Sequence, residues 1–207
     1  MTVRLAVIYY SATGSVHALA DAVAQGAAEA GAEVRLRRVA ELAGEEAIDS
    51  NPAWRTHVDA TRGSVAEATL EDLEWAEAYA FGTPTRFGLP AAQLKQFLDL
   101  TGGLWQAGVF AGRPVTSFTS AQNQHGGQES TILALNNVFY HWGCLIVAPG
   151  YRDPLLFEAG GNPYGTSWGG SDGRPSPAVL AAARFQGRLL HDVAARLAPA
   201  PAAAAAS

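Results

Sequence analysis

The sequence predicts an α/β protein in which a five-stranded parallel sheet, in the order 2-1-3-4-5, lies between two layers of helices. Short apolar runs of strand length alternate with segments whose apolar residues recur at helical spacing, as in consecutive strand–helix–strand units. The first run, residues 3–10, is almost continuously apolar, which is typical of a strand buried on both faces. The 207-residue chain is long enough for one such domain, predicted over residues 1–198, followed by an Ala/Pro-rich disordered tail at 199–207.

The first half of the chain predicts a strand, a helix, a second strand and a connection of mixed structure. After a polar loop at 11–15, apolar residues recur at helical spacing from Val16 to Ala27, and Gly31 is placed to end that helix. Residues 33–37 alternate in polarity like a strand at the edge of the sheet. The connection at 41–75 has a weaker pattern, with turns expected at 49–52 and 62–64 and a short helix at 66–73.

The second half continues the alternation. The third strand is predicted at 78–81 with a loop at 82–88, and a helix follows at about 90–100. The fourth strand, 114–118, ends in a polar, Gly-rich loop at 119–127, and the next helix buries Ile132, Leu135, Val138 and Phe139. The remaining elements are a fifth strand at 144–148, a Gly/Pro-rich segment at 149–177, and a last helix whose apolar residues run from Val179 to Leu197.

Composition excludes several classes of protein. The net charge of −5 without a basic patch argues against nucleic-acid binding. The single cysteine, Cys144, permits no internal disulfide and is expected to be a buried, inert thiol. No apolar run reaches the roughly 20 residues of a membrane span, and no secretory signal is recognisable, so a soluble cytoplasmic protein is expected. No metal site is expected: His17, His57 and His191 lack spaced partners and are interpreted as surface or helix-face residues.

The first loop, residues 11–16, combines three hydroxyl side chains with Gly14 between a buried strand and a helix amino terminus. Unpaired amides and the helix dipole favour an anion at such a position. Because no lysine follows Gly14, the loop does not match the nucleoside triphosphate motif, and it suits a monophosphate held by neutral donors. A simple helix cap by Ser or Thr remains the alternative.

The second loop, residues 82–88, follows the third strand and so shares an edge of the sheet with the first. Gly82 and Gly88 allow a close backbone approach, Arg86 supplies a planar cation and Phe87 a flat apolar surface. The alternative is that Gly, Thr and Pro form an ordinary turn without a ligand, and that Arg86 is only a salt-bridge partner. The amide side chains of the fourth-strand loop are expected to hydrogen-bond the other side of a flat ligand. Together, the three loops predict a site for one monophosphate and one planar heterocycle, which is the shape of FMN.

Several motifs identify a family resemblance. They are Ile8-Tyr9-Tyr10-Ser11, Phe81-Gly82-Thr83-Pro84-Thr85-Arg86-Phe87-Gly88, Phe97-Leu98-Asp99, Thr101-Gly102-Gly103-Leu104-Trp105, Gly126-Gly127-Gln128-Glu129 and Pro163-Tyr164-Gly165. In order from Val3 to about Leu197, the chain resembles the WrbA-type NAD(P)H:quinone oxidoreductases of the flavodoxin-like fold. The resemblance implies FMN as cofactor, ping-pong two-electron reduction of quinones to hydroquinones by NADH or NADPH, and commonly a homotetramer.

The resemblance also assigns residues to the site. It implies no catalytic side chain, because the reactive atom is the flavin N5. Substrate contacts are implied for Thr13, Trp105 and Trp142, in a cleft that neighbouring subunits help to build. The implied cofactor-binding residues are Ser11, Ala12, Thr13, Gly14, Ser15 and Val16 for the phosphate; Pro84, Thr85, Arg86, Phe87 and Gly88 for the isoalloxazine; and Ser120, Ala121, Gln122, Asn123, Gln124, His125 and Gly126 on its flank.

The chain departs from the family pattern mainly in the substrate half of the site. Thr13 and Ser15 stand where the family usually has Tyr and His, and Trp142 stands where it has an active-site His. An indole can stack but cannot exchange a proton near neutral pH. Trp105 and Trp168 both fall in Gly-rich segments, where an indole is expected to line a cleft or an interface.

A flavodoxin-like electron carrier, or a flavin-binding interaction protein without its own nicotinamide oxidation, is the alternative function. The changes at Thr13 and Trp142 favour it, since both fall where substrates would dock. Against it stand the extra segment 149–177, which a minimal carrier does not need, and a net charge of only −5.

Overall fold

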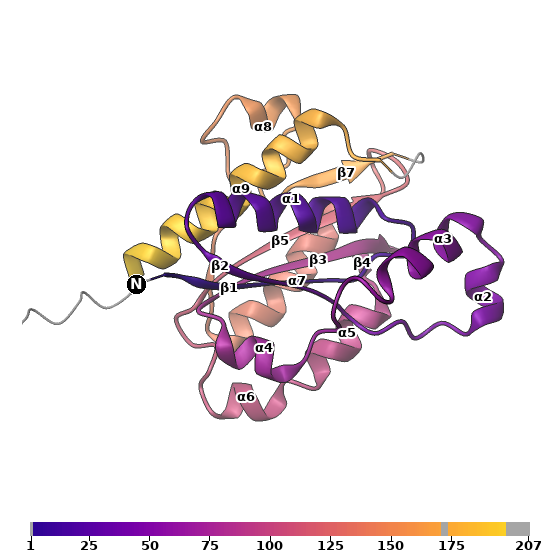
Figure 1. The fold of residues 1–207 in the computed structure, drawn as a ribbon. Helices are drawn as coiled ribbons and strands as arrows, with labels where there is room; N and C mark the ends of the chain where they lie inside the picture. The colour runs from indigo at the N-terminus through magenta and orange to yellow at the C-terminus, as the bar shows by residue number, and fades with distance from the viewer. Residues whose placement is uncertain (1, 171–173, 198–207) are drawn as a thin grey trace, which may run out of the picture.

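A computed structural model describes residues 2–170 and 174–197; the tail predicted at 199–207 lies outside the described residues. Its main sheet contains β1 (Arg4–Tyr9), β2 (Glu33–Arg38), β3 (Ala78–Arg86), β5 (Pro114–Ala121) and β6 (Leu145–Ile146). These strands are parallel neighbours in the order β2-β1-β3-β5-β6, which confirms the predicted order of the five strands. The carboxyl ends of the strands therefore share one edge (Figure 1).

Helices cover both faces of this sheet (Figure 1). On one face, α1 (Ser15–Glu29) and α9 (Pro177–Leu197) bury Leu5, Val7 and Tyr9 of β1. On the other, α4 (Leu70–Trp75), α5 (Ala92–Asp99) and α7 (Gln128–Trp142) lie over the alternate residues Ala6 and Ile8. Because successive strand residues point to opposite faces, both sets have to be apolar, which explains the continuous apolar run in the sequence.

The helices α1 and α9 touch through glycines. A Cβ atom added at Gly26 would lie 2.0 Å from the backbone oxygen of Arg184, and one added at Gly187 would lie 2.0 Å from that of Val23. No side chain fits between the two backbones at these points. The crossing of the two helices, and so the position of α1 over the sheet, depends on the absence of side chains at both glycines.

The prediction of a loop at 82–88 was wrong for most of that segment. Residues 82–84 continue β3 and pair with 118–120 of β5, which itself runs to Ala121 instead of ending at Phe118. Beyond them, β3 turns back into β4 (Leu89–Pro90) through a two-residue hairpin at Phe87 and Gly88, with φ values of 54° and 78°. Pairing with β5, a strand distant in the sequence, extends β3. The residues of the segment do not by themselves indicate such a partner, so the extension was not predicted.

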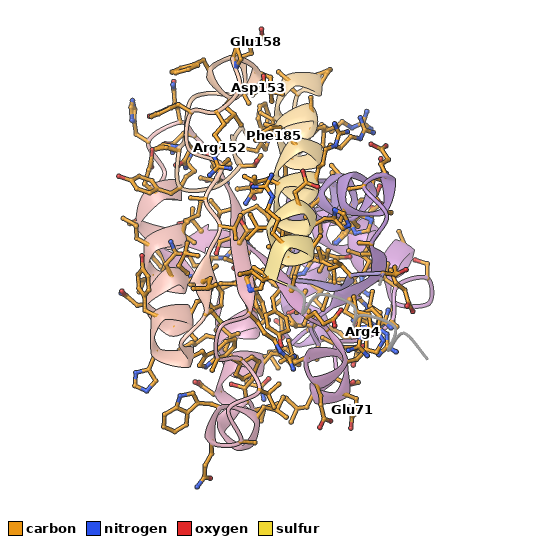
Figure 2. All side chains as sticks on the ribbon, turned by 90° about the vertical axis from the view of Figure 1, so that its left-hand side faces the viewer. Arg4, Glu71, Arg152, Asp153, Glu158 and Phe185 are labelled. Carbon is orange, nitrogen blue, oxygen red and sulfur yellow. The ribbon has the colours of Figure 1, made fainter. Side chains whose placement is uncertain are left out.

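The fifth strand is divided. Leu145 and Ile146 of β6 pair with the beginning of β5, whereas β7 (Ser167–Gly169) pairs with its last residues. The chain leaves the sheet between them and forms α8 (Leu155–Glu158) beside α9. Figure 2 shows Asp153 and Glu158 of this excursion at the top of the molecule, above Phe185 of α9 and at the opposite end from Glu71. The predicted Gly/Pro-rich segment therefore carries both a helix and a sheet strand.

The connection at 41–75 contains α2 (Glu45–Asp49), α3 (Pro52–Thr61) and α4, with α2 and α3 at the side to which the arrow of β3 points (Figure 1). The short helix expected at 66–73 begins only at Leu70, because Thr69 and Asp72 form a capping box there. A further helix, α6 (Gly102–Gln106), replaces the Gly-rich loop expected around Trp105. In the part of the chain that the structure describes, no helix is both long and apolar enough to cross a membrane.

Candidate functional site

The loop between β1 and α1 leaves the helix amino terminus open to a ligand. Gly14 takes the N-cap position with a left-handed φ of 102°, and no side chain caps the helix. The hydroxyl of Ser11 instead accepts a hydrogen bond from the Gly14 amide at 3.1 Å, outside the helix. The alternative of a simple Ser or Thr cap is therefore wrong. The first-turn amides and the positive end of the helix dipole remain available to an anion such as a phosphate.

The segment 83–88, called the 83–88 hairpin below because it ends in the turn at Phe87 and Gly88, is held against α7. The hydroxyls of Thr85 and Thr131 lie 2.6 Å apart, and Ser130 Oγ donates to the Gly88 carbonyl at 3.0 Å. The Arg86 guanidinium donates only to the Thr85 carbonyl among the described residues, so it is no salt-bridge partner there. The Phe87 side chain at the tip is fully exposed. The hairpin thus presents a cation and a bare apolar surface on a rigid base.

The segment after β5 meets this hairpin through backbone contact. Ser120 and Ala121 are buried at the strand end, and residues 122–125 are exposed. Asn123 shapes the turn: its side-chain oxygen accepts from the His125 amide at 3.0 Å, and its carbonyl accepts from Gln128 Nε2 at 2.9 Å. A Cβ atom at Gly127, whose φ is 92°, would lie 2.9 Å from the Cα of Gly88. Two of the segments predicted for the site, the 83–88 hairpin and the 120–127 segment, are therefore in contact and form one continuous surface, which we call the wall of the site.

Two buried polar atoms beside this wall lack a hydrogen-bond partner within the described residues: Gln128 Oε1 and Trp168 Nε1. Gln128 begins α7, and Trp168 lies on β7 directly opposite Ser120. Buried polar groups are nearly always paired in folded proteins, so a free acceptor and a free donor here indicate a ligand or an ordered water. Gln128 was missed as a site residue, although it lies in the Gly-Gly-Gln-Glu motif; Trp168 was expected to line a cleft.

These features fit FMN. The uncapped helix end suits its phosphate, and the hairpin offers an apolar surface for its ring. The free acceptor of Gln128 and the free donor of Trp168 match a flavin edge that both donates and accepts hydrogen bonds. All of these groups lie at the carboxyl edge of β1, β3 and β5, where open α/β sheets bind ligands.

The two tryptophans assigned to substrate binding lie elsewhere in the chain. Trp142 is 7% exposed and stacks on Phe110, with ring centroids 4.1 Å apart, because the last turn of α7 packs into the aromatic core. Trp105 is on the exposed side of α6, and its Nε1 donates to the His141 carbonyl at 3.2 Å. Both lie near the amino end of β5, whereas the site loops follow the carboxyl ends. Within one chain, the structure does not bring them to the site.

His17 and His57, interpreted as surface or helix-face residues, lie on α1 and α3, where the structure brings them together. His17 Nδ1 lies 2.5 Å from the Tyr9 hydroxyl, and the rings of His17 and His57 are 5.4 Å apart. Both histidines are partly buried next to the first loop. Sequence reasoning missed this pair because α3 is brought to α1 only by the fold. Among the described residues, no cluster of three or more His, Cys, Asp or Glu side chains could hold a metal ion.

Comparison with known proteins places this geometry in a family. The model of the NADPH-dependent FMN reductase family matches residues 3–152. A relative from Deinococcus radiodurans named NAD(P)H dehydrogenase (quinone) is 47% identical over 165 residues, covering 80% of this chain and 82% of its own. One of the same name from Geotalea uraniireducens is 42% identical and covers 94% and 99% of the two chains.

Solved structures agree on the fold. A flavodoxin, WrbA-like protein from Agrobacterium tumefaciens superposes with a TM-score of 0.69 at 24% identity, covering 94% of this chain and 99% of that one. The two-electron reduced flavodoxin of Megasphaera elsdenii gives 0.54 at 14% identity, covering 91% and 98%. The predicted flavodoxin-like fold is confirmed, and so is FMN as the cofactor of the family. By the match over residues 3–152 and the similarity to full-length relatives, the chain belongs to the NADPH-dependent FMN reductase family.

Proposed function

We propose that this protein is an FMN-dependent NAD(P)H:quinone oxidoreductase that reduces quinones to hydroquinones in a ping-pong reaction. The observation that carries the proposal is the joining of the uncapped α1 terminus, the 83–88 hairpin and the 120–127 segment at one edge of the sheet. The names of relatives that are 42% and 47% identical support the same activity. The proposal includes a homotetramer, as the motif resemblance implies, and the cytoplasmic location that was expected from the composition.

In this proposal the residues of the chain bind and orient the cofactor. The amides of Ser15 and Val16 and the hydroxyls of Ser11, Thr13 and Ser15 would hold the phosphate, beside Ala12 and Gly14 of the same loop. Pro84 to Gly88 would line the isoalloxazine on one side, and Ser120 to Gly126 would flank it. The Phe87 ring would keep water from one part of the isoalloxazine, since it is apolar and fully exposed. The chemistry that FMN supplies when bound is two-electron transfer from NADH or NADPH to a quinone.

The proposed substrate contacts come from Thr13 and, across a subunit boundary, from Trp105. Thr13 is exposed at the phosphate loop and is proposed to border the nicotinamide nucleotide. Trp105 is proposed to border a substrate cleft contributed by a neighbouring subunit, because within its own chain it lies near the other end of the sheet. Trp142 is not carried into the proposal, since its indole is buried against Phe110.

Steady-state kinetics tests the proposal. FMN-loaded protein is expected to oxidise NADH or NADPH with 1,4-benzoquinone, and double-reciprocal plots at several quinone concentrations should be parallel. A Phe87→Ala variant, loaded with FMN, provides a matched comparison in which the exposed apolar surface is removed. An electron carrier would bind FMN and yet show no turnover with either nucleotide, so that outcome would refute the enzymatic function and favour the alternative.

A further inference from the structure

A cavity adjoins the proposed phosphate loop, residues 11–16, on the side away from the 83–88 hairpin and the 120–127 segment. It has a volume of about 120 Å³ and lies between the carboxyl ends of β1 and β2 and the helix α3. Ser11 of the loop forms part of its lining, and His57 of α3 forms another part. This cavity lies toward β2, whereas the hairpin and the 120–127 segment lie toward β5. Of its lining, only Ser11 belongs to the proposed flavin site.

His57 points its ring at the loop itself. Its Nδ1 atom is 3.6 Å from the position that a Cβ atom at Gly14 would take, so the imidazole lies against the residue that precedes α1. Its ring is also 5.4 Å from that of His17, which is in the first turn of α1. The Nδ1 atom of His17 is hydrogen-bonded to the Tyr9 hydroxyl, while the ring nitrogens of His57 make no hydrogen bond within the described residues. His57 thus has free ring nitrogens next to an open helix terminus.

The other charged groups around His57 already have partners. Arg38 of β2 forms an ion pair with Glu67 at 2.9 Å and donates to the Val65 carbonyl. Glu41, after β2, accepts hydrogen bonds from Tyr10, Trp54 and Gln93. Arg62 is paired with Glu45, and Tyr9 and Asp21 face His17 from β1 and α1. His57 is therefore the side chain of this described group in which both ring nitrogens are free to meet an arriving anion.

The charge state of His57 without an anion follows from its surroundings. Burial and, to a smaller extent, the nearby His17 and Arg38 lower the pKa of His57 to about 4, with Glu41 opposing them. Burial likewise lowers the pKa of His17. A phosphate monoester carries a charge of roughly −1.5 to −2 near pH 7. Such a charge at the α1 terminus would raise the pKa of His57, because an opposite charge favours the protonated imidazole.

We propose that His57 is a further residue of the cofactor phosphate site, which takes up a proton when the phosphate binds and so favours phosphorylated flavin over riboflavin. The proposal rests on the placement of the FMN phosphate at the α1 terminus. Because FMN and riboflavin share the same ring system and differ in the phosphate, a comparison of the two isolates this contribution from all contacts to the isoalloxazine.

Fluorescence titration of the full-length, flavin-free protein tests the proposal. His57→Gln is expected to weaken FMN binding by roughly tenfold, the usual size of a charge-assisted hydrogen bond, and to leave riboflavin binding unchanged. His57→Lys, a permanent cation, should retain most of the FMN affinity. His191→Gln, on α9, is the matched control and should change neither ligand. Because riboflavin binding also requires a folded protein, it separates loss of the charge from loss of the fold.

The pH dependence provides a second readout. The ratio of wild-type to His57→Gln affinity for FMN should fall toward one as the pH rises through the pKa of His57 in the complex. Ionisation of the phosphate of free FMN cancels in this ratio, because both proteins bind the same ligand. If wild type and His57→Gln bound FMN equally well and both still preferred FMN over riboflavin, the proposed role of His57 would be refuted. The placement of the phosphate at the α1 terminus would stand. No preference for FMN in the wild type would instead show that the phosphate is placed wrongly.

Discussion

The crossing of α1 and α9 should not tolerate a methyl group at Gly187. A Cβ atom there would lie 2.0 Å from the Val23 carbonyl oxygen, and 3.1 Å from the Ala27 amide nitrogen. Real Cβ contacts below 3.0 Å essentially do not occur, so Gly187→Ala would have to separate the two backbones by about 1 Å. No rotamer change can relieve the contact, because both atoms are fixed to helix backbones.

Two opposing effects set the size of the loss. Overpacking of a closely packed core costs about 1–3 kcal/mol, and this contact lies at the upper end because it joins two backbones. Alanine is about 1 kcal/mol better than glycine in a helix, which offsets part of that cost. We expect Gly187→Ala to lower the free energy of unfolding by about 2 kcal/mol, equivalent to roughly 4–8 °C in Tm for a chain of this size.

Urea unfolding followed by circular dichroism measures this effect. Gly103→Ala in α6 is the matched control, because nothing lies within 4 Å of its added Cβ atom, and it should be neutral or slightly stabilising. Combining Gly187→Ala with Gly26→Ala should cost less than the sum, because one separation of the helices relieves both contacts. If Gly187→Ala were as stable as Gly103→Ala, the close approach of the two helices would be refuted.

Three further outcomes are expected. Gly82→Ala should lose about 1–3 kcal/mol in urea unfolding, because its Cβ atom would lie 2.1 Å from the buried Phe118 ring, and a neutral result would contradict that contact. Asp72→Asn removes the buried carboxylate that two arginines of β2 share at 3.0 and 3.1 Å, and should cost about 2 kcal/mol; a loss below about 0.5 kcal/mol would count against it. Burial raises the pKa of Glu41, but hydrogen bonds from the Ala43 amide and three side chains lower it on balance. Its stabilisation is therefore present above the unfolded pKa of about 4.3 and is lost as the pH falls through the folded value, so Glu41→Gln should flatten the stability profile between about pH 5 and 3. An unchanged slope in that range would be inconsistent with this role.

The spacing of apolar residues along the sequence was sufficient to predict the main strands, the long helices and the strand order. The apolar run of β1 indicated a strand buried on both faces, and the structure shows Val7 and Ile8 in the cores on opposite sides of the sheet. Helical spacing located α1, α7 and α9 because each buries one face against a neighbouring layer. With right-handed crossovers, these elements leave few topologies, and the predicted strand order was among them.

The errors occurred where a residue's surroundings come from distant parts of the chain. The motif at 82–88 was expected to be a loop because Gly, Thr and Pro break local patterns, yet pairing with β5 keeps residues 82–84 extended. Trp142 was assigned to the substrate site from its place beside a family motif, yet it stacks on Phe110 in the core. His17 and His57 lie 40 positions apart, and no spacing rule joins them.

By itself, the sequence determined the five main strands and the long helices α1, α7 and α9, the order of the strands in the sheet, and the edge at which the loops after the first, third and fourth strands meet. These follow from periodicity and chain connectivity, which are local properties. The tertiary structure alone decided that the 83–88 segment ends in a hairpin turn held against α7, that Gln128 and Trp168 leave a free acceptor and donor, and that His57 faces the loop between β1 and α1. Those facts depend on packing between distant elements, because burial and hydrogen bonding are set by whatever side chain the fold brings alongside.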